Sequence, residues 1–487
     1  MAVIKPPNKS TKHGLKALTA AALSLPGVCC AEGLGDLLED FPIHSPAADY
    51  QYLHYEEGGK RMKADVHHGA LSTSLYDRLK VTASYDVDIY SGATPEFSRP
   101  DTVTDVVTRA SAVAFAVSAG ALLDNPSVVA ARQQAFANGG DGLKAETDAV
   151  RALLQRPIPS SFKTNEVLAD HPEETRKSVN LSFEYELDDN LTYTLSGGHS
   201  SEPDYKSSYV YIGANYELNQ KLTNISGGFG YTLDRVKSVS RPDVSEKKDD
   251  QIYRLGLTQI LGKNTLASIG TSYTRRSGFL SNPYKIVYIR GLLEAEDYID
   301  GFFDVGIATP EQAREEFEIQ DLWMAGVDLF FERRPKARNE WVFAPKLVQY
   351  VPKLDGSLHL GYRYYSDSWE IDSHTIDIKW YQPFSGGWLF SPRFRYYSQS
   401  KAEFFRPFFL TPRADGNYSS DFRLSGYGTI SAGLQIEKKI VDQVSLNVGA
   451  EWTTHKGGLK LGGNGMNNSS YADIDYFTVT AGVNIKF

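Results

Sequence analysis

Apolar and polar side chains alternate with a period of two along most of the chain. The last twelve residues, YFTVTAGVNIKF (476–487), place an apolar or small side chain at every odd position. The same alternation occurs in LKVTASYDVDIY (79–90) and in SVNLSFEYEL (178–187). A period of two predicts β-strands with one face in an apolar medium and the other face in a polar one.

The length of these segments indicates that the apolar medium is lipid. They run roughly 10 to 14 residues, whereas strands of soluble proteins have about 5 or 6 and tilted membrane strands about 9 to 11. Charged residues such as Asp86 and Glu184 stand in the middle of the polar faces. A water-filled lumen tolerates such charges better than a packed interior does. We therefore expect an all-β fold, a transmembrane up-and-down antiparallel β-barrel.

The alternating segments and the lengths of their connections predict about sixteen strands, within a range of roughly 14 to 18. The expected strands are 48–56, 61–75, 78–90, 174–187, 190–199, 206–218, 221–235, 249–261, 264–276, 341–351, 356–366, 372–382, 387–398, 424–438, 443–455 and 475–487. Short turns alternate with longer loops between them, as in outer-membrane barrels with short periplasmic turns and long extracellular loops. An even strand number would leave both termini in the periplasm.

Two of the long connections carry signals for helices. The insertion 91–173 contains the Ala-rich stretch 127–155, whose composition favours a helix. We expect this insertion to form either a plug inside the lumen or a cap outside it. The loop 277–340 contains TPEQ at 309–312, with Thr as N-cap and Pro at the first helical position. Both insertions are expected on the extracellular side.

The first 31 residues are typical of a secretory signal peptide. Four lysines precede a short apolar stretch that ends in small residues, and we expect cleavage after Ala31. A lipid-modified Cys30 is the rival interpretation. With cleavage after Ala31, residues 32–47 would form a periplasmic segment. Residues 48–487 would form the barrel of a Gram-negative outer-membrane protein.

Composition supports this class of protein and argues against others. The 29 tyrosines and 41 glycines, beside only four methionines, suit a β-rich chain. Both cysteines lie in the signal, so neither a disulfide nor a thiolate metal site is expected in the mature chain. Removal of the signal's four lysines would change the formal net charge from −9 to −13. A chain this acidic argues against nucleic acid as a partner.

The polar faces of three adjacent strands supply the candidate functional residues. Neighbouring strands lie about 4.8 Å apart, so their long side chains can reach one another. The predicted basic wall of the lumen consists of His359, Arg363, Lys379, Arg393 and Arg395. The predicted lumen-facing carboxylates are Asp86, Asp88, Glu184, Glu186, Asp377 and Glu451, and all but Asp377 are expected to face the basic wall. Two interpretations stay open: a transverse field that orients solutes in a pore, or charges that pair and plug the lumen.

No catalytic, cofactor or metal site is expected. His67 and His68 are adjacent in one strand and so face opposite ways, which is poor geometry for a shared metal ion. Asp86 and Asp88 share a face, but an acidic lumen wall explains them equally well. Neither Gly-x-Ser-x-Gly nor His-Glu-x-x-His occurs, and there is no phosphate-binding loop pattern.

The C-terminal strand predicts how the barrel closes and is assembled. In a closed barrel the last strand pairs with the first, and its apolar face meets lipid. An alternating last strand that ends on an aromatic residue resembles the signal by which outer-membrane barrels reach their assembly machinery. The residues that would carry this signal are Phe477, Val483, Ile485 and Phe487.

Several stretches are similar to a family of Gram-negative outer-membrane barrels classified only as a domain of unknown function. They are YDVDIYSGATP (85–95), LSNPYK (280–285) and, most specifically, the block 332–405, which begins ERRPKARNEWVFAPK. The resemblance extends over nearly the whole mature chain. It implies an outer-membrane location and a barrel fold, and it implies no activity, substrate or catalytic residue.

The leading functional hypothesis is a porin-like channel for small polar or ionic solutes, not an enzyme. The expected partners are outer-membrane lipid and lipopolysaccharide, and the barrel assembly machinery. The alternative is a non-conducting barrel that serves as a scaffold or export partner for periplasmic or surface proteins. A barrel enzyme with residues at the outer rim is the third hypothesis.

Overall fold

The computed structural model describes residues 43–59, 61–76, 78–100, 126–140, 142, 144–145, 164–239, 241–290, 327–409, 413–463, 465 and 473–487. The predicted signal peptide (1–31) lies outside these residues. So do most of the predicted periplasmic segment and the helix signal at 309–312.

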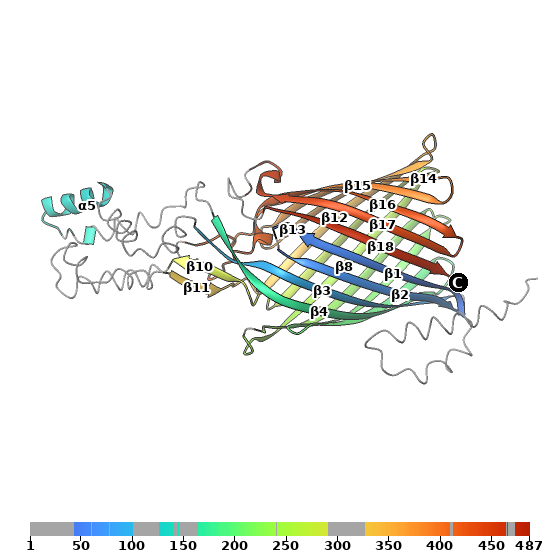
Figure 1. The fold of residues 1–487 in the computed structure, drawn as a ribbon, viewed down its shortest axis with the longest axis horizontal. Coiled ribbons are helices and arrows are strands. Elements are labelled where there is room, and N and C mark those ends of the chain that lie inside the picture. Colours follow the sequence, from blue (N-terminus) through green and yellow to red (C-terminus); the bar gives the residue numbers. More distant parts are fainter. Residues whose placement is uncertain are drawn as a thin grey trace, which may run out of the picture.

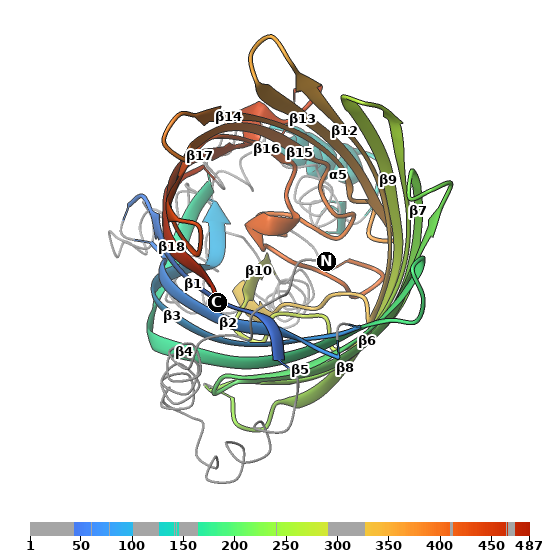
Figure 2. The ribbon, with the colours of Figure 1, turned by 90° about the vertical axis from the view of Figure 1, so that its right-hand side faces the viewer.

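Sixteen antiparallel strands close into one barrel (Figures 1 and 2). They are β1 (Ile43–Glu57), β2 (Lys63–Leu75), β3 (Leu79–Pro100), β4 (Thr164–Glu186), β5 (Leu191–Ser201), β6 (Tyr205–Leu218), β7 (Thr223–Lys237), β8 (Ser245–Gly262), β9 (Thr265–Gly278), β12 (Ala337–Val351), β13 (Gly356–Asp367), β14 (Asp372–Phe384), β15 (Trp388–Gln399), β16 (Tyr427–Val441), β17 (Val444–Lys456) and β18 (Ile474–Lys486). Each corresponds to one expected strand, which confirms the predicted all-β barrel.

The outward faces of the strands are apolar and exposed. Leu255 and Val448, for example, keep 65% and 57% of their surface accessible. Aromatic rings continue from strand to strand on this face: Tyr273 lies between Tyr253 and Trp341, with ring centroids 6.2 and 4.6 Å apart. A closed band of exposed apolar side chains with aromatic rows is the surface that a transmembrane barrel presents to lipid. Among the described residues, no helix is long and apolar enough to cross a membrane.

The two ends of the barrel differ in their connections. At the end that holds the C-terminus, every connection between consecutive strands has at most four residues; we call this the turn end (Figure 1). The opposite end, the loop end, carries the long connections, including those between β3 and β4 and between β15 and β16. All connections longer than four residues therefore lie at the loop end, as the sequence predicts, although those between β5 and β6 and between β13 and β14 are as short as the turns.

The N-terminal and C-terminal strands close the barrel. β1 pairs with β18 in antiparallel register, with Tyr50 opposite Val483. The backbone N–H of Phe487 donates to the carbonyl of Pro46 at 2.8 Å, so hydrogen bonding continues to the last residue. The first strand begins at Ile43 instead of the expected residue 48, because the strand continues past an irregularity in its pairing with β2 near Pro46.

The two predicted insertions differ from expectation. The first and last residues of 91–173 are strand, because β3 extends to Pro100 and pairs with β4 from Thr164 onward. In 277–340, β9 extends to Gly278 and β12 begins at Ala337. Within the Ala-rich stretch, α5 (Pro126–Ala137) is helical and lies beyond the loop end (Figure 1). The second insertion contains an unpredicted hairpin of β10 (Ile286–Arg290) and β11 (Val327–Phe331), which lies outside the barrel sheet.

The buried apolar cluster lies at the loop end. Trp369 and Ile371, between β13 and β14, pack against four apolar residues of the β15–β16 connection, and we call the six residues together the mouth cluster. The four residues from the β15–β16 connection are Ala402, Phe404, Phe405 and Leu424. Trp369 and Phe404 meet edge to face, with centroids 5.1 Å apart. A small apolar core therefore holds the β15–β16 connection against the connection between β13 and β14.

Candidate lumen site

The pairing of strands shows which side chains face the lumen. Leu360 of β13 is opposite Ile378 of β14, and both are exposed on the apolar outer face. Since side chains alternate along a strand, the next pair, Gly361 and Asp377, points inward. The same reasoning places His359, Arg363 and Lys379 on the lumen side.

The basic wall contains its own carboxylates. Asp377 of β14 forms ion pairs with both arginines of β15, at 2.5 Å from Arg393 and 3.2 Å from Arg395. Glu451 of β17 lies 3.5 Å from Arg393. Glu451 therefore belongs to the basic wall, and the expectation that it faces this wall from across the lumen is wrong, because β17 is only two strands from β15.

Aromatic rings accompany the remaining cations. The Lys379 ammonium lies 4.5 Å from the centre of the Tyr381 ring, and the His359 ring lies 4.6 Å from it. Arg363 stands over Tyr365 at 5.4 Å. Lys346 of β12 is opposite Gly361 and joins the same wall. The sequence reasoning missed Lys346, although the alternation in 341–351 contained the signal for its orientation.

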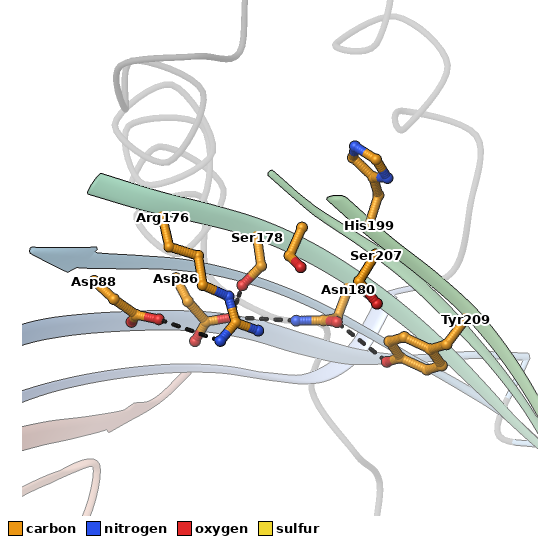
Figure 3. A pocket seen from close by; sticks show the side chains of 9 residues that line it. Asp86, Asp88, Arg176, Ser178, Asn180, His199, Ser207 and Tyr209 are labelled. Carbon is orange, nitrogen blue, oxygen red and sulfur yellow. Dashed lines mark hydrogen bonds and ion pairs between the residues drawn. The ribbon is translucent and has the colours of Figure 1, made fainter. Parts of the chain in front are cut away.

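The acidic wall is a hydrogen-bonded group on β2 to β6, and Figure 3 shows its side chains on β3 to β6. Asp86 accepts hydrogen bonds from Ser178 at 2.9 Å and Asn180 at 3.2 Å, and pairs with His68 at 2.5 Å. Asp88 lies 3.9 Å from Arg176. Apart from His68, these side chains line a cavity of about 330 Å³ together with Tyr209. The hydroxyl of Tyr209 donates to Asn180 at 3.1 Å, which extends the network to β6.

The other two predicted carboxylates lie nearer the turn end of β4. Glu184 is 3.5 Å from Lys80 of β3, and both side chains are about half exposed. Glu186 is opposite Thr192 in the β4–β5 pair and is exposed. Neither lines the cavity around Asp86, so the acidic wall at mid-depth consists of fewer residues than the sequence predicted.

The two walls face each other across the barrel. In the circular order of strands, β3 is eight positions from β13, and β4 is eight positions from β14. Eight steps in a ring of sixteen lead to the opposite side. Asp86 lies seven residues from the turn end of β3, and Lys379 lies five residues from the turn end of β14. The lumen therefore has a basic and an acidic side at similar depth.

A ladder of ion pairs follows the loop end of the wall from β7 to β13, which sequence reasoning did not predict. Its members are Asp234, Lys248, Asp250, Arg276, Glu340, Arg338 and Asp367. Each successive contact is between 2.5 and 3.3 Å. Charges of alternating sign on neighbouring strands stabilise one register over its alternatives.

A buried ion cluster connects two loop segments beside the mouth cluster. Arg334 donates to Glu332 at 2.6 and 3.0 Å, and to Asp421 at 2.8 Å. Ser419 also donates to Glu332. Burial alone would raise the pKa of the Asp421 carboxyl, but the charges of Arg423 and Arg334 outweigh it and lower that pKa. The β15–β16 connection is thereby fixed to the segment that precedes β12.

The sequence decides which family the chain belongs to. Residues 15–246 and 239–478 match the family model described as "Protein of unknown function (DUF3570)", in two segments that cover most of the chain. The chain is a member of the DUF3570 family. The sequence-based resemblance to a barrel family of unknown function is confirmed.

The solved structures that the DUF3570 chain resembles are similar to it only at low sequence identity. No curated protein matches its sequence. Similar solved structures include OccK1 (OpdK) from Pseudomonas aeruginosa, with 9% identity, a TM-score of 0.37, and coverage of 92% of this chain and 99% of that one. The ferric enterobactin receptor PfeA from P. aeruginosa, as a double mutant, has 8% identity, a TM-score of 0.38, and coverage of 85% and 54%. The siderophore receptor PirA from Acinetobacter baumannii has 8% identity, a TM-score of 0.36, and coverage of 85% and 53%. The chain spans about half the length of the two receptors.

Potential metal ligands do not cluster in the described part of the DUF3570 chain. It contains no group of three or more His, Cys, Asp or Glu side chains placed to hold a metal ion. His67 points outward to Tyr50, whereas His68 points inward to Asp86. The lumen, as its described residues define it, carries cationic side chains on one side and carboxylates on the opposite side.

Proposed function

We propose that this DUF3570 barrel is an outer-membrane channel for small polar or ionic solutes. The observation that carries the proposal is the basic side of the lumen facing an acidic side eight strands away. A barrel of sixteen strands ordinarily leaves room for an aqueous passage. Charged side chains along such a passage would remain hydrated and would provide solutes with successive polar contacts.

The opposing walls would act on a solute through their field. A dipolar or zwitterionic molecule would align with its negative end toward β12 to β15 and its positive end toward β2 to β4. Low-dielectric walls concentrate field lines within a passage, which raises the local concentration of charged solutes. No bond of the solute changes in this process, so we assign no catalytic residue.

The proposed location is the outer membrane, reached after export directed by the N-terminal signal. The loop end would face lipopolysaccharide and the cell exterior, and the turn end the periplasm. The C-terminal residues Phe477, Val483, Ile485 and Phe487 would form the signal read by the assembly machinery. The proposed assembly signal is supported by the alternation of the terminal strand, which is hydrogen-bonded up to its last residue.

A second candidate function is a non-conducting scaffold or export partner. The mouth cluster and the buried ion cluster favour it, because they fix the β15–β16 connection at the loop end. A fixed connection at this position would narrow the mouth. Conductance decides between the two functions, since a scaffold needs no open lumen.

The first experiment is single-channel recording of the refolded mature chain in a planar bilayer. The channel proposal expects stable conductance and a change of both conductance and ion selectivity in the Arg393→Ala/Arg395→Ala variant. The control is Arg235→Ala/Arg275→Ala, which removes two arginines from the outer face near the loop end. A folded barrel without conductance would support the scaffold. Conductance that the lumen variant leaves unchanged would refute the role of the basic wall.

A further inference from the structure

The strands β6, β7 and β8 carry different charge patterns on their two faces near the loop end. On the inner face, Asp234 of β7 pairs with Lys248 of β8 at 2.9 Å, as part of the ladder of ion pairs. On the outer face, Lys206 of β6 is directly opposite Arg235 of β7, which is in turn opposite Lys247 of β8. We call these three cations the outer row. Charges alternate in sign on the inner face, whereas the outer row has one sign only.

The outer row points away from the lumen. Side chains alternate along a strand, so Arg235 shares its face with Leu233, which is 55% exposed. Lys206 shares its face with Val210, which is 43% exposed. Lys247 lies on the same side because it is the direct partner of Arg235. All three cations are themselves exposed, so the row lies on the surface that the barrel presents to its surroundings.

The cations of the outer row form no ion pair with the described residues. Among the described residues of β6 to β8, the outer face near the loop end carries a single carboxylate, Asp249, which accepts a hydrogen bond from Ser277 of β9 at 2.8 Å. Like charges directly opposite each other destabilise a pair of strands. A row of cations that opposes the pairing of its own strands is better explained by a bound anion than by stability.

On β1 and β2 the outer face shows the contrasting arrangement at the same end of the barrel. Lys63 of β2 contacts Glu56 of β1 at 2.8 Å, and His54 contacts Asp65 at 2.8 Å. Glu56 is opposite Phe477 of β18, which is exposed on the lipid face. The rim of the barrel thus neutralises its cations with neighbouring carboxylates on β1 and β2, and the outer row lacks such carboxylates.

The outer row stands at the edge of the apolar outer surface. The exposed Leu233 precedes Arg235 by two residues, which is a rise of about 6.8 Å along the strand. Nearer the turn end, the rings of Phe229 and Tyr253 lie on the same face with centroids 5.0 Å apart. In membrane barrels, aromatic girdles flank the apolar band at the level where lipid headgroups begin. The row is therefore placed to meet headgroups, with acyl chains against the surface beside it.

We propose that Lys206, Arg235 and Lys247 form a binding site for the phosphate groups of lipopolysaccharide. Two strand spacings place the ends of the row about 10 Å apart, so the site can contact more than one anionic group of the same headgroup. Lysine and arginine together give phosphate oxygens several charge-assisted hydrogen bonds. Lipid is the expected source of the phosphate, because the apolar surface continues directly from the row at Leu233. This inference goes beyond the proposed channel and rests on the proposed orientation, with the loop end toward the cell exterior.

The test is native mass spectrometry of the refolded mature chain in detergent, titrated with purified lipopolysaccharide. The wild type is expected to form a one-to-one complex. The Lys206→Gln/Lys247→Gln variant is expected to bind at least tenfold more weakly, and Lys206→Arg/Lys247→Arg to retain binding. The matched control Lys63→Gln removes an outer-face cation that is already paired with Glu56, and should bind as the wild type does. Equal affinities of the wild type and the double glutamine variant would overturn the proposal.

Two further probes act on the wild type and need no variant that must fold. Dephosphorylated lipopolysaccharide is expected to bind at least tenfold more weakly than the intact lipid. Equal binding of the two lipids would show that acyl chains alone hold the lipid, and would overturn the role of the cations. Inorganic phosphate at millimolar concentration should not displace bound lipopolysaccharide. Displacement would assign the row to free anions and overturn the assignment to a lipid.

Conductance separates this inference from the proposed channel. It is recorded in phospholipid bilayers without lipopolysaccharide, so the outer row cannot affect it through a bound lipid. A barrel that conducts but does not distinguish intact from dephosphorylated lipopolysaccharide would retain the channel and refute the lipid site. A barrel that binds lipopolysaccharide through the outer row, yet never conducts, would retain the lipid site and refute the channel.

Discussion

Replacing Asp421 by Asn tests whether the buried ion cluster fixes the β15–β16 connection. The Asp421 side chain is 1% exposed and contacts Arg334 at 2.8 Å and Arg423 at 2.6 Å. Asparagine preserves the shape of the side chain and removes its charge. We expect the connection to open more often, while the barrel strands remain paired by their own hydrogen bonds.

The free-energy cost of Asp421→Asn depends on the contacts that Arg423 and Arg334 retain without the carboxylate. Arg423 is 62% exposed on its side chain, so water replaces most of its lost contact. Arg334 is 13% exposed and retains only its pairing with Glu332. Removing one partner of a buried ion pair costs about 3–5 kcal/mol. Because Glu332 still compensates part of the Arg334 charge, we expect about 2–4 kcal/mol, on the order of a hundredfold in the opening equilibrium.

Hydrogen exchange measured by mass spectrometry is the assay. Peptides from 413–426 should exchange on the order of a hundredfold faster in Asp421→Asn, whereas peptides from β16 should not change. The control is Asp415→Asn, which removes a carboxylate from the same connection that is paired with Arg413 at 3.0 Å but is more exposed. An increase below about threefold, or an equal increase in the control, would refute the idea that this cluster holds the mouth.

The pH dependence of the same contact has a defined sign. Although burial by itself raises the pKa of Asp421, Arg423 and Arg334 lower it below its ordinary value of 3.8. A carboxyl whose pKa is lower in the folded protein stabilises the fold above its unfolded pKa, and this contribution is lost as the pH falls toward the folded pKa. Exchange in 413–426, corrected for the intrinsic rate, should therefore be the same at pH 7 and pH 5. Faster corrected exchange at pH 5 than at pH 7 would contradict a lowered pKa for Asp421.

Three further predictions concern the wall, the last residue and an exposed loop pair. Leu434→Arg places a cation on the lipid face and should destabilise the barrel by about 2–4 kcal/mol in denaturant titrations, whereas Gln435→Arg, on the lumen face, should cost under about 1 kcal/mol. Phe487→Ala should reduce the heat-modifiable barrel in cell outer membranes and leave refolding of the purified chain unchanged; equal loss in both would indicate a folding defect. Arg413→Ala should raise the pKa of Asp415 from about 2 toward its ordinary value, because the hydrogen bond from Arg413 is the main cause of its lowering. Carboxyl chemical shifts as a function of pH would determine that pKa, and an unchanged pKa would contradict this cause.

The barrel could be predicted because its main determinant is local. Each strand shows its apolar face within its own ten to fifteen residues, as 476–487 does. The hairpin of β10 and β11 was missed because each strand has only five residues, too few for a period to be visible. The extension of β3 to Pro100 was missed for another reason: PEFSRP lacks a clear alternation, and its pairing partner 164–173 is remote in the sequence.

The lumen residues could be assigned to a face but not to their partners. Alternation is enough to orient Arg393 and Asp377 inward. Which of them meet depends on strand register and on the closure of the ring, and neither leaves a trace in one strand's sequence. Glu451 was therefore expected to face the arginine that it actually contacts.

The number of strands decides which strands lie opposite each other across the lumen. It therefore links the fold to the proposed function of the basic and acidic walls. With sixteen strands, β3 lies opposite β13, and Asp86 faces the wall that carries Lys379. Had β10 and β11 joined the ring between β9 and β12, eighteen strands would place β12 opposite β3. The two charged sides would then be displaced by about one strand spacing, roughly 4.8 Å. The exclusion of this hairpin from the barrel therefore sets β13, instead of β12, opposite β3.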